Sequence, residues 1–173
     1  MKKYLLTIGL LAVTNIFAQN KNTVYNYDYN YANKMSRLWI DFDIIAEYDF
    51  LENKVFHKDF TLKDGYIFKN TNDSLIEIGF YNTEQFIANR EVYEMKYPAA
   101  GRIAIRKKGD KNWLRVNTKQ TTISFMESAD NIPEMVQFWA ITTALQREFF
   151  YRERRLYEKA TSTNITVKTE TSL

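Results

Sequence analysis

Apolar and polar residues alternate in several stretches of the chain, and the alternation is clearest over residues 38–50. The apolar series takes every second position there: Leu38, Ile40, Phe42, Ile44, Ala46, Tyr48 and Phe50. The polar or bulky residues between them include Trp39, Asp41, Asp43, Glu47 and Asp49. Because successive side chains of a strand point to opposite faces, this pattern predicts one long strand with an apolar and a polar face.

Shorter runs of the same kind follow, separated by turn residues. They predict strands over residues 55–62, 66–69, 75–81, 83–97, 102–106, 113–116 and 121–126. In the first of these, Phe56, Phe60 and Leu62 are expected to point inward. Asp64-Gly65 is typical of a two-residue hairpin turn, and the polar residues 107–112 predict a second hairpin. Residues 83–97 fit neither period well, so a short helix is the alternative there. With residues 38–50, the chain shows about eight strands.

A long helix is predicted over residues 131–159. Pro133 suits the first helical turn, and Glu134 complements the positive end of the helix dipole. Residues 135–145 are apolar nearly all round, which predicts that this half of the helix is enclosed by protein. The apolar run ends at Gln146, well short of the roughly 20 residues that cross a bilayer, so no transmembrane span is predicted. The second half is amphipathic, with a solvated back.

These elements predict an α+β fold in which an antiparallel meander sheet or barrel curls around a long C-terminal helix. No repeat or linker divides residues 37–160, which are expected to form a single domain. Residues 161–173 are rich in threonine and are expected to be a polar tail. Two other folds remain open: a Bet v 1-like sheet gripping the helix, and a lipocalin-like barrel with the helix packed outside.

The order of elements resembles the tubby C-terminal-like group, which includes the LURP-one-related proteins and the phospholipid scramblases. The strand series from Leu38 to Met126 and the apolar helix from Pro133 to Tyr151 carry this resemblance. It implies a closed antiparallel barrel of twelve strands around a C-terminal helix. No functional residue of the group maps onto this sequence, so the resemblance implies a fold and no site.

Residues 1–18 have the pattern of an export signal. Lys2 and Lys3 precede an apolar run, and Ala18 precedes the expected cleavage site. The chain has no cysteine, which excludes disulfides, cysteine-ligated metals and anchoring through a lipidated cysteine. Export of such a chain fits the bacterial periplasm or the medium. Removal of the two lysines lowers the formal charge from +3 to +1, so no nucleic-acid partner is expected.

The mature chain begins with residues 19–36, a segment rich in tyrosine and asparagine that is expected to form an N-terminal arm. Its tyrosines alternate with polar residues: Tyr25, Tyr27, Tyr29 and Tyr31. On a strand these rings would share one face and could stack on sugars or glycan chains. The other interpretation is an edge strand or a mobile polar arm.

The densest basic segment surrounds the second predicted hairpin. It consists of Arg102, Arg106, Lys107, Lys108 and Lys111. Such a patch could bind phospholipid headgroups or an anionic glycan by charge. The alternative is that the lysines and arginines only keep the hairpin soluble.

Residues suited to catalysis are scarce. His57 is the only histidine, so a His-based metal triad is excluded, and we interpret it as a surface residue of a strand. No nucleophile-elbow, phosphate-loop, zinc-protease or dinucleotide motif is present. Asp41, Asp43, Glu47 and Asp49 could form a hydrolytic pair or a calcium site, or simply the solvated face of a sheet. We predict no catalytic residue, no metal and no cofactor.

The sequence therefore favours an exported, non-enzymatic binding or interaction module of the bacterial cell envelope, whose partner is an envelope protein, a glycan or a lipid. The candidate contact residues are Tyr25, Tyr27, Tyr29, Tyr31, Arg102, Arg106 and Lys108. One alternative is a carrier that holds a lipid or another apolar ligand between helix and sheet. Another is a carbohydrate-active enzyme that uses the strand carboxylates Asp41 and Asp43.

Overall fold

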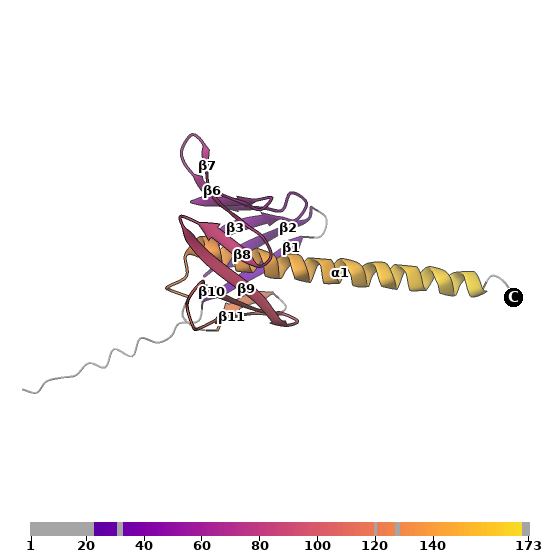
Figure 1. The fold of residues 1–173 in the computed structure, drawn as a ribbon. Coiled ribbons are helices and arrows are strands. Elements are labelled where there is room, and N and C mark those ends of the chain that lie inside the picture. Colours follow the sequence, from indigo (N-terminus) through magenta and orange to yellow (C-terminus); the bar gives the residue numbers. More distant parts are fainter. Residues whose placement is uncertain (1–22, 31–32, 120, 127–128, 171–173) are drawn as a thin grey trace, which may run out of the picture.

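The computed structural model describes residues 23–30, 33–119, 121–126 and 129–170, which form a closed antiparallel barrel of twelve strands with one long helix (Figure 1). The strands are β1 (Val24–Asn30), β2 (Met35–Ile40), β3 (Asp43–Asp49), β4 (Lys54–His57), β5 (Phe60–Lys63), β6 (Tyr66–Asn70), β7 (Leu75–Tyr81), β8 (Gln85–Ala88), β9 (Glu91–Ala99), β10 (Arg102–Lys107), β11 (Leu114–Lys119) and β12 (Thr122–Phe125). The helix is α1 (Glu134–Glu170). The predicted fold class is confirmed. The predicted export signal and Tyr31 lie outside the described residues.

Each strand pairs with its sequence neighbours, and β1 closes the barrel against β12. The closing register pairs Val24 with Ser124 and Tyr25 with Ile123. On its other side β1 pairs with β2, from Asn26 opposite Trp39 to Asn30 opposite Met35. The prediction of an edge strand or arm for this segment is therefore wrong, because β1 is hydrogen-bonded on both sides.

The long strand predicted over residues 38–50 is a hairpin of β2 and β3. Ile40 pairs with Asp43, and the two residues between them, Asp41 and Phe42, have φ angles of 49° and 73°. Positive φ at both positions is the geometry of a type I′ turn, whose twist matches that of the flanking strands. The Phe42 side chain is 94% exposed. A two-residue loop alone would move the apolar positions from even to odd numbers. A bulge between Leu38 and Trp39 shifts the register by one residue, so Leu38 pairs with Ala46 and the even-numbered alternation resumes in β3.

Three predicted strands are hairpins, and together with β1 they account for the difference between eight and twelve strands. Residues 55–62 form β4 and β5, and Phe56 points outward while Phe60 and Leu62 point inward. Residues 83–97 form β8 and most of β9, which confirms strand over helix. The hairpin at Asp64-Gly65 is confirmed, with φ angles of 51° and 87°.

The first half of α1 runs through the barrel, as Figure 1 shows, and its buried side chains fill the interior. Phe138 and Trp139 are fully buried, and the Phe138 ring lies 5.6 Å from the Tyr25 ring and 5.5 Å from the Phe60 ring. The Trp139 indole Nε1 donates a hydrogen bond to the Asn82 carbonyl oxygen at 2.8 Å. The predicted enclosure of this half is confirmed.

Most of the described polar side chains inside the barrel have hydrogen-bond partners, and the buried Ser36 hydroxyl is an exception. The Tyr25 hydroxyl donates to Gln137 Oε1 at 2.8 Å, and Gln137 Nε2 donates to the Ile132 carbonyl at 2.9 Å. Thr142 and Thr143 donate their hydroxyls to carbonyls one turn earlier in the helix. These hydrogen bonds offset the free-energy cost of burying polar groups. The helix can therefore have Gln137, Thr142 and Thr143 in the core.

The second half of α1 leaves the barrel and projects from it (Figure 1). The helix continues to Glu170, so the predicted end at Lys159 was too early. The chain has no glycine or proline after Pro133, and these are the residues that most often stop a helix. No part of the described helix is both long enough and apolar enough to cross a bilayer.

Candidate functional site

The tyrosines of β1 share one face, as the alternation predicts, but that face lies inside the barrel. Tyr25 and Tyr27 are 3% and 4% exposed. Tyr29 is half-buried, and its ring packs at 4.8 Å from Phe50 and 5.5 Å from Phe149. The burial of Tyr25 and Tyr27 removes both rings from the predicted stacking platform.

The basic candidates lie along β10 and the turn after it. Arg102 and Arg106 are on the outer face of the strand, and Lys108 is in the turn. Lys108 comes six positions after Arg102, which corresponds to about 20 Å at the usual rise of a strand. The three side chains therefore form a stripe along the barrel wall and do not converge on one point.

Two acidic residues of β9 hold part of this stripe in place. Glu94 accepts from Arg106 at 2.9 Å, and Glu91 pairs with Lys107. Hydrogen bonds from Lys107 and Tyr93 lower the pKa of Glu91, so its carboxylate stays ionised. The pKa of Tyr93 is raised to about 12, mainly by burial. The phenol therefore stays protonated and donates a hydrogen bond to Glu91.

Sequence reasoning missed three residues that extend this stripe onto the neighbouring strands: Trp113, Lys96 and Arg115. Lys96 on β9 and Arg115 on β11 both pair in register with Ala104 of β10. The Trp113 ring lies 3.9 Å from Lys96 Nζ and 4.3 Å from Arg106 Cζ, so cation–π contacts fix both cations on the wall. Only the strand register brings these residues together, and the sequence gives no direct signal of it.

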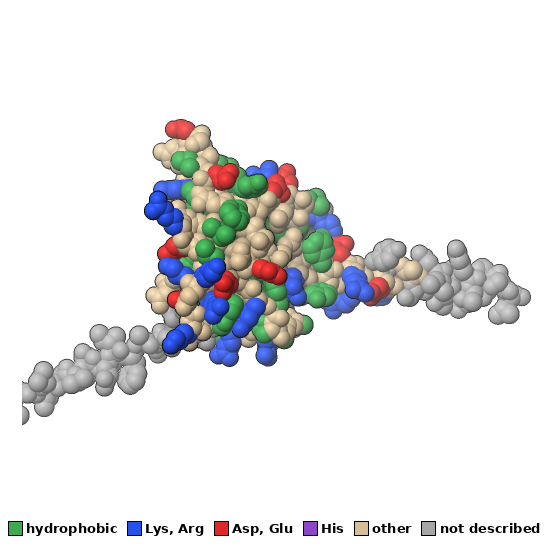
Figure 2. Space-filling model, viewed as in Figure 1, with side chains coloured by type: hydrophobic (Ala, Val, Ile, Leu, Met, Phe, Trp, Pro, Cys, Tyr) green, Lys and Arg blue, Asp and Glu red, His purple; other side chains and the backbone are tan. Residues whose placement is uncertain are grey.

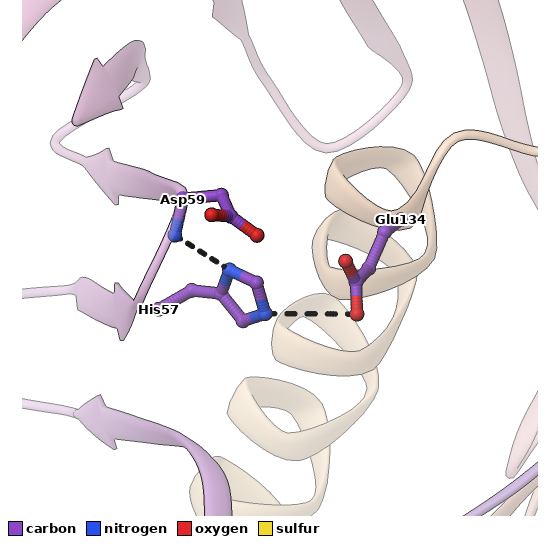
Figure 3. Close-up of side chains that lie close together, drawn as sticks. All are labelled: His57, Asp59 and Glu134. Atoms are coloured by element: carbon purple, nitrogen blue, oxygen red, sulfur yellow. Dashed lines mark hydrogen bonds and ion pairs between the residues drawn. The ribbon is translucent and has the colours of Figure 1, made fainter. Parts of the chain in front are cut away.

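His57 is buried, so its interpretation as a surface residue is wrong. Its ring stacks on Phe60 at 4.2 Å. Nδ1 accepts a hydrogen bond from the Asp59 backbone N–H at 3.1 Å, and Nε2 lies 3.6 Å from Glu134 Oε1 (Figure 3). Burial lowers the pKa of His57, while the carboxylates of Glu134 and Asp59 oppose this shift.

The atoms of His57, Asp59 and Glu134 lie within 4.8 Å of one another, which raises the question of a metal site. A neutral imidazole that accepts at Nδ1 carries its proton on Nε2, and that proton points toward Glu134. Neither ring nitrogen then offers a lone pair to a metal ion. The cluster instead joins the β4–β5 turn to the first turn of α1.

The four carboxylates of residues 38–50 do not form one face. Asp41 lies in the β2–β3 turn, and the bulge in this hairpin shifts the register between Asp43 and Glu47. Glu47 pairs with Arg37 across the hairpin at 3.2 Å. Asp49 accepts hydrogen bonds from the backbone N–H groups of Leu51 and Glu52 at 2.8 and 3.0 Å. Two of the four acids thus have structural roles, in an ion pair and in a turn.

The spaces between α1 and the barrel wall are small. A pocket lined in part by Ile103, Ala144 and Arg147 has a volume of about 20 Å³, and another, beside Tyr29 and Phe149, about 10 Å³. Each holds one water molecule at most. An open groove of about 500 Å³ lies outside, where the helix leaves the barrel.

The projecting half of α1 exposes large side chains beside this groove. Phe150 is 59% exposed, and Tyr151 and Leu156 are exposed to a similar degree. Arg147 leaves the barrel mouth over the Tyr97 ring, 4.2 Å from its centroid. The surfaces open to a partner are therefore this helix end and the outer wall.

Comparisons with protein-family models, with curated proteins and with solved structures find no match for this chain.

Proposed function

We propose that this chain is an exported, non-enzymatic interaction module of the bacterial cell envelope, which binds its partner with the outside of the barrel. The observation that carries the proposal is the filling of the interior by the chain's own helix. Phe138, Trp139 and Ile141 are fully buried there. They occupy the space in which a barrel of this kind would hold a ligand, which leaves the outer surface for binding.

The alternative of a lipid carrier has less support. Ligand pockets commonly measure about 300–1,000 Å³ and enclose most of the ligand. The pockets between α1 and the wall measure about 20 and 10 Å³. A carrier would have to expel the first half of α1 from the barrel, which would expose its fully buried aromatic side chains to water.

The alternative of a carbohydrate-active enzyme also loses support. A glycosidase needs two carboxyl groups on either side of a bound sugar, about 5–9.5 Å apart. Here Glu47 is paired with Arg37, Asp49 caps a turn, and Asp41 is itself in a turn. His57 is neutral, buried and used to join two elements of the fold.

We also propose kinship with the tubby C-terminal-like group, on architecture alone. The twelve antiparallel strands and the central C-terminal helix agree with that group in general form. The polar residues after Leu145, which would be costly inside a closed barrel, lie where the helix leaves it. Arg147 packs on Tyr97, and Glu148 pairs with Arg152 at 2.8 Å.

Two measurements on the mature chain, which begins at Gln19, test the function. Native mass spectrometry of protein from its own envelope fraction should give the bare polypeptide mass, whereas a small molecule lost on denaturation would favour a carrier. Co-sedimentation with envelopes stripped of their own copy should show saturable binding. If the envelopes retain no more of this chain than of an unrelated protein of similar charge, the interaction module is refuted.

A further inference from the structure

The formal charge of the barrel is divided between two arcs of its wall. Residues 90–119 carry nine Lys or Arg and three Asp or Glu, a charge of +6. Residues 23–89 carry six basic and eleven acidic side chains, a charge of −5. The strand order places β9, β10 and β11 side by side, with β2 to β7 elsewhere around the ring. We call the outer surface of β9–β11 the basic arc.

Figure 2 shows this division on one face of the molecule. Lys and Arg side chains gather on the lower part of the barrel, over β9 to β11, and Asp and Glu side chains lie mostly above it. Such a separation produces a directed field that attracts anions to one side and repels them from the other. The net charge of +3 conceals it, because the two arcs largely cancel.

The cations of the basic arc are arranged as a grid. Lys96, Ala104 and Arg115 lie side by side on three neighbouring strands, and Arg102 and Arg106 flank Ala104 along β10. Neighbouring strands lie about 4.8 Å apart, and alternate residues of a strand about 6.6 Å apart. A convex grid of this kind suits a ligand with repeated charges better than a single small anion, which is normally enclosed.

A groove gives the grid a local contact site. It has a volume of about 310 Å³, and its lining includes Pro98, Arg102, Arg115 and Met126. Two guanidinium groups at one groove can engage a carboxylate, sulfate or phosphate through paired hydrogen bonds. The Pro98 ring and the Met126 thioether provide apolar surface beside them.

The basic arc lacks the side chains that would insert into a bilayer. Residues 90–119 are all described, and none of their large hydrophobic side chains is exposed. Peripheral proteins that insert into membranes combine basic residues with exposed Trp, Phe or Leu. Among the exposed large hydrophobic side chains, Met126 borders the groove beside the arc, and Phe42, Phe80 and Phe150 are examples that lie on other parts of the barrel or on the projecting helix.

We propose that the basic arc binds a linear anionic polysaccharide, with Arg102 and Arg115 as its main contact residues. This inference deepens the proposed function, since it names the chemistry of the envelope partner. Lys96 and Arg106, held by Trp113, contact further anionic groups of the same chain. The attraction is mainly electrostatic, so the affinity falls steeply as the salt concentration rises.

The test uses the mature chain and two polymers of the same sugar, dextran sulfate and uncharged dextran. At 50 mM salt we expect binding to dextran sulfate and none to dextran. The double variant Arg102→Glu/Arg115→Glu should bind at least tenfold more weakly, and Arg115→Glu alone about fivefold. The matched control is Lys69→Glu, an exposed change on β6 that alters the net charge as Arg115→Glu does and should shift the affinity less than twofold.

Circular dichroism and thermal unfolding should show that all variants fold. Three results would overturn the inference: no binding to dextran sulfate, equal loss for Lys69→Glu and Arg115→Glu, or tighter binding to inorganic polyphosphate or to anionic phospholipid vesicles than to dextran sulfate. Any of them leaves the envelope co-sedimentation result unaffected. The failure of this inference can therefore be told apart from failure of the proposed function.

Discussion

The two halves of α1 have one continuous backbone and opposite surroundings. The half from Val136 to Leu145 is enclosed by the barrel strands. The turns just after Gln146 still pack on the barrel rim, where Phe149 contacts Tyr29 and Glu153 pairs with Lys34, and the helix beyond them projects from the barrel. In the enclosed half, a side chain is selected by how it packs and whether its polar atoms find partners. In the projecting half both constraints are weaker, because side chains such as Phe150 and Leu156 are more than half exposed. The comparison separates what holds the fold together from what is left to contact a partner.

Replacing Trp139 gives the largest expected contrast between the halves. Trp139→Ala removes a fully buried indole and its hydrogen bond to Asn82, and should lower the free energy of unfolding by about 3–5 kcal/mol. Phe150→Ala, on the exposed half, should change it by less than about 0.5 kcal/mol. Urea unfolding measures both values. Similar losses in the two variants would mean that both halves are equally buried.

A smaller effect is expected from the polar contacts of the enclosed half. Tyr25→Phe leaves Gln137 Oε1 buried without the hydroxyl that donates to it, which should cost about 1–3 kcal/mol. Tyr66→Phe is the matched change on the outer wall, where the ring is half exposed and water replaces any lost partner. Its expected cost is below about 0.5 kcal/mol. If the two substitutions cost the same, the Tyr25–Gln137 bond does not form.

A pH effect should follow from the cluster that joins the β4–β5 turn to the start of the enclosed half. The groups facing His57 are Glu134 on α1 and the neighbouring Asp59 and Lys58, and burial lowers its pKa below the ordinary 6.5. The neutral ring therefore stabilises the fold above about pH 6.5, and this stabilisation is lost as the pH falls toward the lowered pKa.

Thermal unfolding between pH 8 and pH 5 measures this effect against His57→Gln, which cannot titrate. The difference in midpoint between the two proteins should narrow or reverse as the pH falls. The loss should be smaller than that of either buried substitution above. A wild-type midpoint that rises on acidification relative to the variant would show that the protonated ring is the favoured form.

The smallest effect belongs to the ion pairs of the projecting half. Glu148 and Arg152 meet at 2.8 Å with a spacing of four residues, and both are partly exposed. Such pairs contribute about 0.2–0.5 kcal/mol, so Arg152→Ala should lie near the limit of detection in urea unfolding. A loss above about 1 kcal/mol would indicate that this part of the helix is packed against protein.

Sequence reasoning predicts the enclosed helix because residues 135–145 are apolar nearly all round, and it predicts the Asp64-Gly65 hairpin because glycine permits the turn. It misses the turn at Asp41-Phe42, since a phenylalanine at positive φ is uncommon. The orientation of His57 is also missed, because the predicted strand is interrupted by a turn between β4 and β5. The turn exchanges the two faces in β4, so that His57 points inward and Phe56 outward.

The candidate site was predictable in part. Arg102 and Arg106 are visible as charges in the sequence, but their partners are set by register. Lys96 and Arg115 are nineteen positions apart in the chain and lie on either side of Ala104. A bulge between β9 and β10 fixes that alignment, and a bulge cannot be counted from alternation alone. The tyrosine platform was mispredicted for a different reason, since alternation shows that the rings share a face but does not say whether that face is inside.

Hydrogen–deuterium exchange along α1 tests most directly the claim that the helix fills the barrel with one half and leaves the other free. The logarithm of an amide's protection factor rises in proportion to the free energy needed to open its hydrogen bond. We predict that peptides covering residues 136–145 exchange as slowly as those of the barrel strands, while peptides covering residues 150–159 exchange many times faster. Equal protection along the helix, or fast exchange over residues 136–145, would contradict the filled barrel.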